Sequence, residues 1–538
     1  MQMVKRLNLD AMIKREDLEI STTGRGSIGS GGIPVSELQT NRLHYGLLRK
    51  PSFQRVTNDW DIDNVVTLIK AFRNGSLIPA LILWKSDAGY TFVIDGAHRL
   101  SAFIAWVNDD YGAGPISRRF FEDKIPKQQK DYADECRQRV VSEVGSYAEI
   151  STILQQENPT RERIKWASNI GKPLDAQWVE GDADTAEDSF LAINQRAVEI
   201  NETEKYMIVS RRKPNVIAAR ALVRAATGYE YWSKFEEAQR EEIKRKAKKI
   251  YDVMFEPENA DLSRSIEMPI AGKPYSAEAL RISLDLVNFA NDLRAKKALD
   301  ELQNDEDGSK TIRFLDKVHG VVKYLSGDGK ASLGLHPSVY FWGATKHHPS
   351  AFLAMVSFIQ HLNSSGRMID FCFHRAEFEE FLVANDNIVK HILGKYGGWT
   401  KSAPSVFEMY KLIFEGFRGG KASSAILASL IADHRFKGLS EVVEIENSPG
   451  KRFTNDSRGA TRRRELLRSA LRCPLCYARL PISALSDDHV VRVQDGGRGD
   501  ADNDQLTHPF CNTGFKEYLV SSGREFPPRP AFLAEAAE

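Results

Sequence analysis

Residues 473–516 read CPLCYARLPISALSDDHVVRVQDGGRGDADNDQLTHPFCNTGFK, and this stretch decides how the C-terminal part of the chain folds. It begins with Cys473 and Cys476, which are separated by two residues, and it closes with His508 and Cys511 at the same spacing. These two pairs, called knuckles below, supply the four soft or borderline ligands that tetrahedral zinc requires. Because four protein ligands leave no open coordination position, the sequence predicts a structural zinc ion.

Between the knuckles an acidic residue stands beside a histidine, as Asp488 and His489, in front of the apolar pair Val490–Val491. At the start of a strand, such a pair can divide two tasks. The carboxylate binds a hard divalent cation, and the imidazole stays free to take a proton from water. Asn503 follows a glycine-rich turn, and Asn512 comes directly after the last zinc ligand. A purely structural zinc ribbon would explain the knuckles but not this second set of residues.

This segment resembles the HNH endonuclease family, whose ββα-metal fold carries a catalytic histidine on its first strand. The resemblance implies that His489 is the general base and that Asp488 and Asn512 ligate Mg²⁺ or Mn²⁺. It also implies that Asn503 orients the loop and the base. The sequence departs from the family pattern by having Asn512 in place of a final histidine and His508 in place of a cysteine zinc ligand. Both replacements still offer a suitable donor atom.

A basic stretch leads into the first knuckle. Residues 450–472 contain two acidic residues, Asp456 and Glu465. They contain eight basic residues: Lys451, Arg452, Arg458, Arg462, Arg463, Arg464, Arg468 and Arg472. Such a run can hold phosphates beside an active site, and Arg462, Arg463 and Arg464 are the predicted DNA contacts. Lys516 joins them, because the HNH resemblance puts a basic residue near phosphate at this position. A solvated helix face is the simpler alternative.

The N-terminal part shows an α/β pattern. Asp61 is expected to cap a helix with an apolar stripe that ends near Gly75, and two short strands follow at 80–84 and 90–94. Asp95, Gly96, His98 and Arg99 come next, at the start of another helix. Helix N-terminal amides and a guanidinium form a cradle for anions. In the simpler alternative, Asp95 caps the helix and Arg99 pairs with a local carboxylate.

This region resembles the N-terminal domain of GmrSD-type proteins, which have a DGQQR motif and a ParB/sulfiredoxin-like fold. The matching positions are Gln54–Arg55, Trp60, the run Asn74–Pro79, Asp95–Arg99, Asn194 and Glu204. The resemblance implies a site for a nucleoside triphosphate or a DNA phosphate, formed by Asp95, Gly96, His98, Arg99, Gln54 and Arg55. Ala97 and His98 replace the two glutamines, which leaves the nucleotide preference open.

Length and composition limit the organisation of the chain. Its 538 residues are too many for one hydrophobic core. We expect a multidomain α+β protein with a ParB/sulfiredoxin-like α/β module at 1–210, a mostly α-helical middle region at 211–445 and a zinc-stapled ββα-metal HNH domain at 446–538. Five cysteines, an odd and low number, argue against a disulfide framework. With no apolar run long enough to span a bilayer and no secretory leader, a cytoplasmic location is expected.

The pairing of the two resemblances predicts a metal-dependent DNA endonuclease, of the kind that restricts modified or foreign DNA in bacterial antiphage defence. The expected cofactors are structural Zn²⁺, catalytic Mg²⁺ or Mn²⁺ and an NTP that the N-terminal module binds or hydrolyses. The expected partners are DNA, copies of the same chain or other defence proteins, and no membrane. A competing prediction is a non-catalytic zinc-containing adaptor that holds DNA with a ParB-like clamp.

Overall fold

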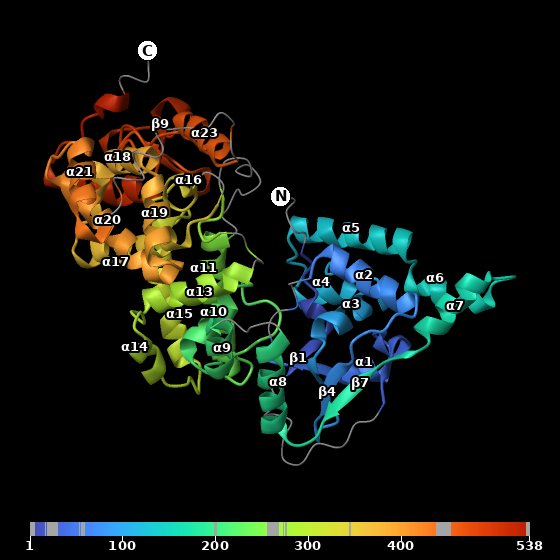
Figure 1. The fold of residues 1–538 in the computed structure, drawn as a ribbon. Helices are drawn as coiled ribbons and strands as arrows, with labels where there is room; N and C mark the ends of the chain where they lie inside the picture. Colours follow the sequence, from blue (N-terminus) through green and yellow to red (C-terminus); the bar gives the residue numbers. More distant parts are fainter. Residues whose placement is uncertain are drawn as a thin grey trace. The chain divides into compact units, whose positions relative to one another are not determined.

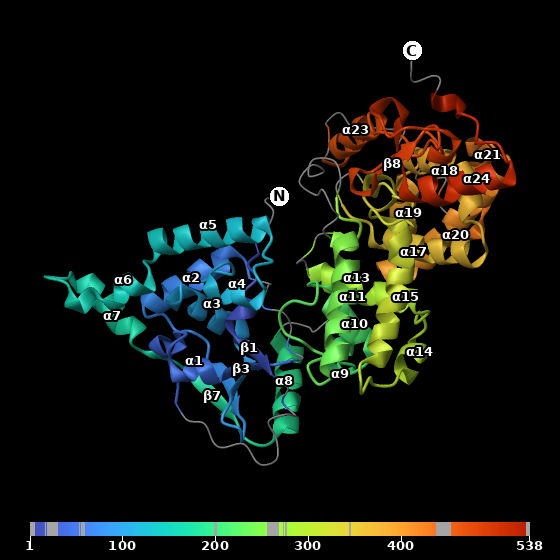
Figure 2. The ribbon, with the colours of Figure 1, turned by 180° about the vertical axis from the view of Figure 1, so that it is seen from behind.

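A computed structural model describes residues 6–16, 18, 31–52, 54, 57, 60–197, 202–255, 268–272, 274, 277–343, 346–436, 439, 453 and 455–533. Figures 1 and 2 show the chain from opposite sides. It divides into two units, of which unit 1 comprises Met1–Arg211 and Thr227–Ser233 and unit 2 comprises Arg212–Ala226 and Lys234–Glu538. The chain is mixed α/β, as expected, with most of its helices in unit 2.

A five-stranded sheet in the order β1-β3-β5-β4-β7 forms the centre of unit 1. Its strands are β1 (Lys14–Glu16), β3 (Leu48–Pro51), β4 (Leu81–Lys85), β5 (Thr91–Asp95) and β7 (Ala176–Val179). Strands β4 and β5 pair antiparallel, and the other neighbours pair parallel. A separate two-stranded sheet joins β2 (Ile33–Pro34) to β6 (Pro173–Leu174).

Side chains alternate along the strands of the central sheet, so each face presents its own apolar residues. Helices cover both faces. Leu83 and Val93 pack into a core with helices α2 (Ile62–Arg73) and α3 (Ala97–Val107). Trp84 and Phe92 point to the opposite face and pack against α8 (Ala183–Ala197). The remaining helices of unit 1 are α1 (Leu43–Leu47), α4 (Pro115–Phe120), α5 (Lys127–Glu143), α6 (Tyr147–Ser151), α7 (Arg161–Ile170) and α9 (Glu202–Val209).

The expected helix after Asp61 is confirmed. The Asp61 carboxylate accepts a hydrogen bond from the Asn64 backbone N–H at 2.8 Å, which satisfies one of the free donors at the start of α2. Gly75 has φ +79°, a left-handed conformation that ends the helical segment. The two predicted strands and the helix after them appear as β4, β5 and α3.

Unit 2 is built mainly from helices. They are α10 (Pro214–Leu222), α11 (Glu237–Phe255), α13 (Ala277–Ala290), α14 (Lys296–Glu301), α15 (Ser309–Leu325), α16 (Pro337–Tyr340), α17 (Pro349–Ser364), α18 (Met368–Ala384), α19 (Asn387–Tyr396), α20 (Trp399–Arg418), α21 (Ser423–Ala432), α23 (Asn455–Arg468) and α24 (Lys516–Ser522). The only sheet described in this unit pairs β8 (Ser486–His489) with β9 (Asp504–Thr507). No helix in the described part of the chain is long and apolar enough to cross a membrane.

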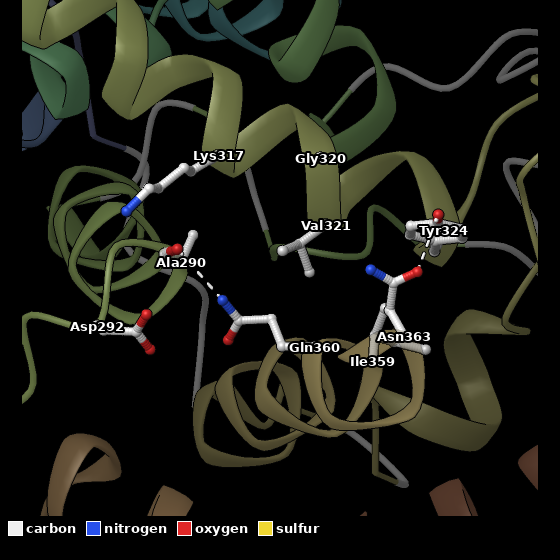
Figure 3. A pocket seen from close by; sticks show the side chains of 9 residues that line it. All are labelled: Ala290, Asp292, Lys317, Gly320, Val321, Tyr324, Ile359, Gln360 and Asn363. Carbon is white, nitrogen blue, oxygen red and sulfur yellow. Dashed lines mark hydrogen bonds between the residues drawn. The ribbon is translucent and has the colours of Figure 1, made fainter. Parts of the chain in front are cut away.

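A pocket of about 300 Å³ lies between α13, α15 and α17. Figure 3 shows that polar side chains at its edge bind neighbouring helices: Gln360 Nε2 donates to Ala290 O at 3.2 Å, and the Tyr324 hydroxyl donates to Asn363 Oδ1 at the same distance. A Cβ at Gly320 would meet no heavy atom within 4 Å, so this glycine leaves room in the wall of the pocket. These contacts join the three helices of the bundle.

Candidate metal centre and catalytic hairpin

The four predicted zinc ligands converge. One donor atom from each of Cys473, Cys476, His508 and Cys511 lies within 4.8 Å of the others, and all four residues are buried. His508 Nδ1 is 3.4 Å from Cys476 Sγ and 3.7 Å from Cys511 Sγ. Three cysteine sulfurs and one imidazole nitrogen make a donor set that fits structural zinc.

The orientation of His508 is set from its far side. Its Nε2 lies 3.0 Å from Arg479 O, which can only accept, so the contact selects the tautomer that donates from Nε2. In that neutral tautomer the lone pair of Nδ1 faces the cysteines. A backbone carbonyl that holds the second ring nitrogen in this way is usual for a metal-bound histidine, so the contact supports zinc binding.

Each knuckle is formed by a tight turn. Cys473 N donates to Ala478 O at 2.9 Å and Tyr477 N donates to Cys473 O at 2.8 Å, with Tyr477 at φ +60°. The second knuckle continues into a π-helical turn at Cys511–Phe515, where Asn512 N donates to His508 O. Cys372 of α18 contacts the Cys511 thiol, although the two positions are far apart in sequence. The sequence therefore predicted the four members of the group but not this fourth nearby thiol.

Strands β8 and β9 form an antiparallel hairpin that is followed by α24. His489 is the cross-strand neighbour of Asp504, and Asp488 is the neighbour of Gln505. Alternation along β8 buries Asp488 and leaves His489 half-buried. A Cβ at Gly499 would lie 3.9 Å from His489 Nε2, so this glycine keeps one side of the imidazole uncrowded.

Asn503 closes the long loop between the two strands. Its Oδ1 accepts from Val491 N at 2.7 Å, and its Nδ2 donates to Val491 O at 3.0 Å and to Arg498 O at 2.7 Å. Val490 N also donates to Asn503 O at 3.0 Å. These bonds fix the backbone directly after His489, so the side chain of Asn503 organises the loop.

Asn512 connects the π-helical turn to β8. Its Nδ2 donates to Ser486 Oγ at 3.1 Å and to Asp487 O at 2.9 Å. These bonds use the side-chain nitrogen, and they orient the amide so that its oxygen is the atom available to a cation. The amide is thus held against the strand that carries Asp488 and His489.

Asp488 has three donor contacts inside the protein. Lys516 Nζ lies 2.8 Å from Asp488 Oδ1 and 3.0 Å from Oδ2, and Gln505 Nε2 donates to Oδ2 at 2.8 Å. Lys516 Nζ also donates to His489 O. Asp488 is 5% exposed and Lys516 is 6% exposed. Lys516, predicted to bind DNA, is therefore paired with the predicted metal ligand.

The basic residues before the knuckle lie in different environments. Arg462 and Arg464 are exposed on α23. Arg463 is 9% exposed, and it donates to Ser338 O at 2.6 Å and to Asp386 Oδ2 at 2.8 Å. Its guanidinium therefore binds the helical part of unit 2 instead of facing solvent, because a buried cation needs a paired acceptor. Only Arg462 and Arg464 of the three remain available at the surface.

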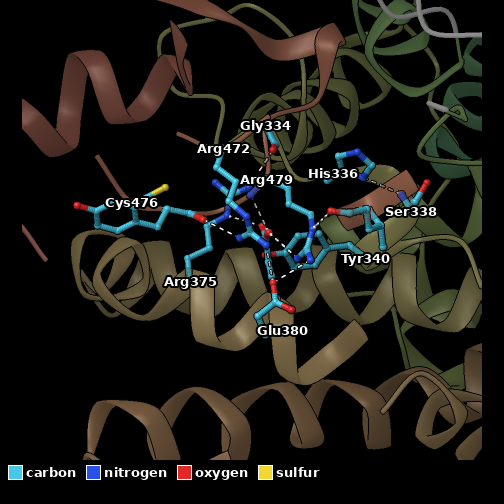
Figure 4. A network of polar contacts seen from close by, with 12 residues as sticks. Gly334, His336, Ser338, Tyr340, Arg375, Glu380, Arg472, Cys476 and Arg479 are labelled. Atoms are coloured by element: carbon cyan, nitrogen blue, oxygen red, sulfur yellow. Dashed lines mark hydrogen bonds and ion pairs between the residues drawn. The ribbon is translucent and has the colours of Figure 1, made fainter. Parts of the chain in front are cut away.

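A buried polar network joins the segment around Arg479 to α18. Arg375 Nε donates to Glu379 Oε1 at 3.1 Å, and Glu379 Oε2 accepts from Arg479 N at 2.9 Å. Arg479 and Arg472 also pair with Glu380 at 2.8 and 2.7 Å. Figure 4 shows Arg375, Arg472 and Arg479 gathered beside α18. Burial raises the pKa of Glu379, but Arg375 and Arg479 outweigh that effect and lower its pKa below the ordinary value.

Breaking this network is expected to destabilise unit 2. Glu379→Ala leaves the fully buried guanidinium of Arg375 without its carboxylate, and removing one partner of a buried ion pair costs about 3–5 kcal/mol. Chemical denaturation followed by circular dichroism measures the loss. Glu377→Ala, on the same helix but with a side chain that is 43% exposed, is the matched control. Equal stabilities of the two variants would contradict this assignment.

In unit 1, the motif after β5 is a tight turn into α3. Gly96 has φ +93° at the N-cap of α3, and a Cβ there would lie 2.6 Å from Leu81 Cδ2 and 3.0 Å from Arg99 Nη2. Only glycine fits this position. Arg99 Nη2 donates to Asp95 Oδ2 at 2.8 Å. Arg99 thus pairs with a local carboxylate, and the N-cap position of α3 is Gly96, which has no side chain to cap the helix.

The other predicted phosphate-site residues are partly described. His98 stacks on Trp60, with ring centroids 5.9 Å apart and planes at 24°. Gln54 is buried, and its backbone carbonyl accepts from Arg15 Nη1 at 2.5 Å. Arg55 lies outside the described residues. Of the predicted phosphate-site residues, Asp95 and Arg99 therefore form an ion pair, and His98 stacks on Trp60.

A buried charge cluster next to Gln54 was not predicted. Asp10 Oδ1 accepts from Arg15 Nη2 and from Lys50 Nζ, each at 2.7 Å. Arg15 and Lys50 are neighbours on the parallel strands β1 and β3. Asp10 and Arg15 are close in the sequence, but Lys50 is 40 positions from Asp10, and the pairing of β1 with β3 brings it to them.

Comparison with known families concerns the N-terminal part. Residues 35–208 match the family described as GmrSD restriction endonuclease, N-terminal domain. The match supports a GmrSD-type N-terminal module, as the motifs around Asp95 predicted. No curated protein and no solved structure matches the chain.

Proposed function

We propose that this protein is a metal-dependent DNA endonuclease of the restriction type, in which a GmrSD-type module controls an HNH-type catalytic hairpin. The family match over residues 35–208 supports a role in restriction. The C-terminal geometry supports the choice of catalytic unit, because the candidate residues lie on one hairpin and the turn beside it, next to a buried Cys₃His group. Two observations support DNA as the substrate: the matched family is described as a restriction endonuclease domain, and Arg462 and Arg464 are exposed on α23.

The chemistry assigned to the hairpin is phosphodiester hydrolysis. His489 takes a proton from water at an imidazole nitrogen, and the water oxygen forms a bond to phosphorus as the bond to a deoxyribose oxygen breaks. Asp488 and Asn512 would hold a Mg²⁺ or Mn²⁺ ion, which stabilises the charge that develops on the phosphate. Asn503 keeps the loop after His489 in place through its bonds to Val491.

One observation carries this proposal over a plain zinc ribbon. The side chains of Asn503 and Asn512 form hydrogen bonds with the backbone on either side of His489, at Val491 and Asp487 respectively. A zinc module needs neither asparagine to hold its metal. Two amides that fix both ends of the segment around one half-buried histidine are expected when the position of that histidine matters for chemistry.

The direct test is a cleavage assay on supercoiled plasmid DNA. Purified protein is incubated with Mg²⁺ or Mn²⁺, with and without an NTP, on modified and unmodified plasmid. We expect nicked or linear product only when the divalent cation is present, and EDTA should stop the reaction. A protein that binds DNA under all these conditions and never cuts it would be the zinc-containing adaptor instead.

For the N-terminal module we propose binding of a nucleoside triphosphate or of a DNA phosphate at the start of α3. Arg99→Ala is expected to weaken NTP binding about tenfold or more, because a hydrogen bond to a charged group contributes about 1.5–3 kcal/mol. Titration calorimetry measures the change. Arg139→Ala, which removes an arginine partly exposed at the surface of the same unit, is the control. Equal affinity of wild type and Arg99→Ala would show that Arg99 serves only its pair with Asp95.

A further inference from the structure

Lys516 binds the carboxylate that the proposed function assigns to a metal ion. Its ammonium contacts both oxygens of Asp488, at 2.8 and 3.0 Å, and the carbonyl oxygen of His489. The side chains of the pair are almost fully buried, at 7% for Lys516 and 4% for Asp488. The pair is therefore a built feature of the hairpin and not a chance surface contact.

An ammonium and a divalent cation compete for the same carboxylate. Both need its oxygens, and two positive charges a few ångströms apart in a buried site repel each other. Gln505 Nε2 already takes a further position on Oδ2. A cation that binds Asp488 must therefore displace the Lys516 ammonium, which needs another acceptor once it leaves.

A DNA phosphate is an anionic group that can accept hydrogen bonds from the displaced Lys516 ammonium. Lys516 begins α24, and its ammonium contacts the backbone carbonyl of His489, the residue whose imidazole is assigned as the general base. A flexible four-carbon stem allows the charge to change partner without movement of the helix. The phosphate attacked near His489 would thus lie within reach of the released ammonium.

We propose that Lys516 is an internal substitute for the catalytic cation: it neutralises Asp488 before DNA binds and transfers to the phosphate when DNA and metal arrive. This inference rests on the proposed nuclease function. It predicts that the metal and DNA bind cooperatively, since each favours the arrangement in which Lys516 has left Asp488. Free protein then holds the metal weakly, and cleavage chemistry is assembled only on substrate.

The test measures Mn²⁺ binding to zinc-loaded full-length protein by electron paramagnetic resonance, with and without duplex DNA. The His489→Ala background prevents cleavage and keeps the backbone carbonyl that Lys516 contacts. Adding Lys516→Met, which keeps a similar length without the charge, is expected to tighten Mn²⁺ binding to the DNA-free protein tenfold or more. It should also reduce the effect of DNA on Mn²⁺ affinity. Arg492→Met is the matched control, because Arg492 pairs with Glu517 on the same helix and does not contact Asp488.

The possible outcomes are distinguishable. Unchanged or weaker Mn²⁺ binding in folded Lys516→Met protein overturns the inference and leaves the proposed function intact. If Asp488→Asn fails to reduce Mn²⁺ binding in either background, the assigned metal ligand is wrong, and the proposed function fails with it. If Lys516→Met does not fold, Lys516→Gln is used, and an equal Mn²⁺ affinity with and without DNA in the lysine-containing protein overturns the inference by itself.

Discussion

Replacing His489 by alanine is expected to lower the rate of DNA cleavage by about 10²–10⁴-fold, the usual effect of losing a general base. The imidazole is half-buried at the end of β8, beside the loop that Asn503 closes. Without it, no other group described at this position is assigned to take the proton from the attacking water. Single-turnover nicking of supercoiled plasmid at saturating Mg²⁺ measures the chemical step directly.

The controls for His489→Ala separate chemistry from folding. His434→Ala changes a histidine that is 94% exposed, so it should cut at the wild-type rate. Asp488→Ala and Asn512→Ala should lose activity by weakening cation binding, and high Mn²⁺ should restore part of it, whereas the loss in His489→Ala should persist. A folded, zinc-loaded His489→Ala protein that cuts at the wild-type rate would move the catalytic site elsewhere.

Loss of a zinc ligand is expected to have the largest effect on stability. Cys476→Ser removes one of four converging donors, and structural zinc supplies about 10–16 kcal/mol of apparent binding free energy in zinc-finger peptides. Elemental analysis should fall from about one zinc per chain, as the four-ligand set requires, toward none. Limited proteolysis should then cut the segment between residues 473 and 516, because the knuckles no longer hold its ends together.

Cys136→Ser is the matched control for the zinc prediction. Cys136 is also a fully buried cysteine, but it belongs to α5 of unit 1 and is not a member of the Cys₃His group. Its replacement should leave the zinc content unchanged. If Cys476→Ser retained a full equivalent of zinc and the stability of the wild type, the assignment of the four ligands would be rejected.

The sequence predicted the features that depend on local patterns. The cap at Asp61, the strands before Asp95 and the helix after it follow from side-chain periodicity and capping chemistry. The buried Cys₃His group was predictable because a Cys-x-x-Cys pair and a His-x-x-Cys pair are short and chemically specific. In each case the residues that decide the structure lie within a few positions of one another.

Contacts between distant segments were not predictable in this way. Arg375 and Glu379 are spaced i, i+4 on α18 and resemble an ordinary exposed ion pair in sequence. In the structure both are buried, and the backbone N–H of Arg479, 100 positions away, donates to Glu379. Arg463 likewise looked like one more cation of a basic run, but its partner Asp386 is 77 positions distant. A single sequence gives no signal that such partners meet.

The contact between the segment around Arg479 and α18 restricts which fragments of this protein can fold independently. A fragment that starts at residue 446 keeps Arg479 but loses Glu379, and it loses the Ser332 carbonyl that accepts from Phe510 N at 2.8 Å. Phe515 would also lose Phe373, whose ring centroid lies 5.1 Å away. We therefore expect a fragment that starts at residue 446 to be less stable than one that also keeps the segment from Lys330 onward, whose carbonyl accepts from the Thr513 hydroxyl at 2.8 Å.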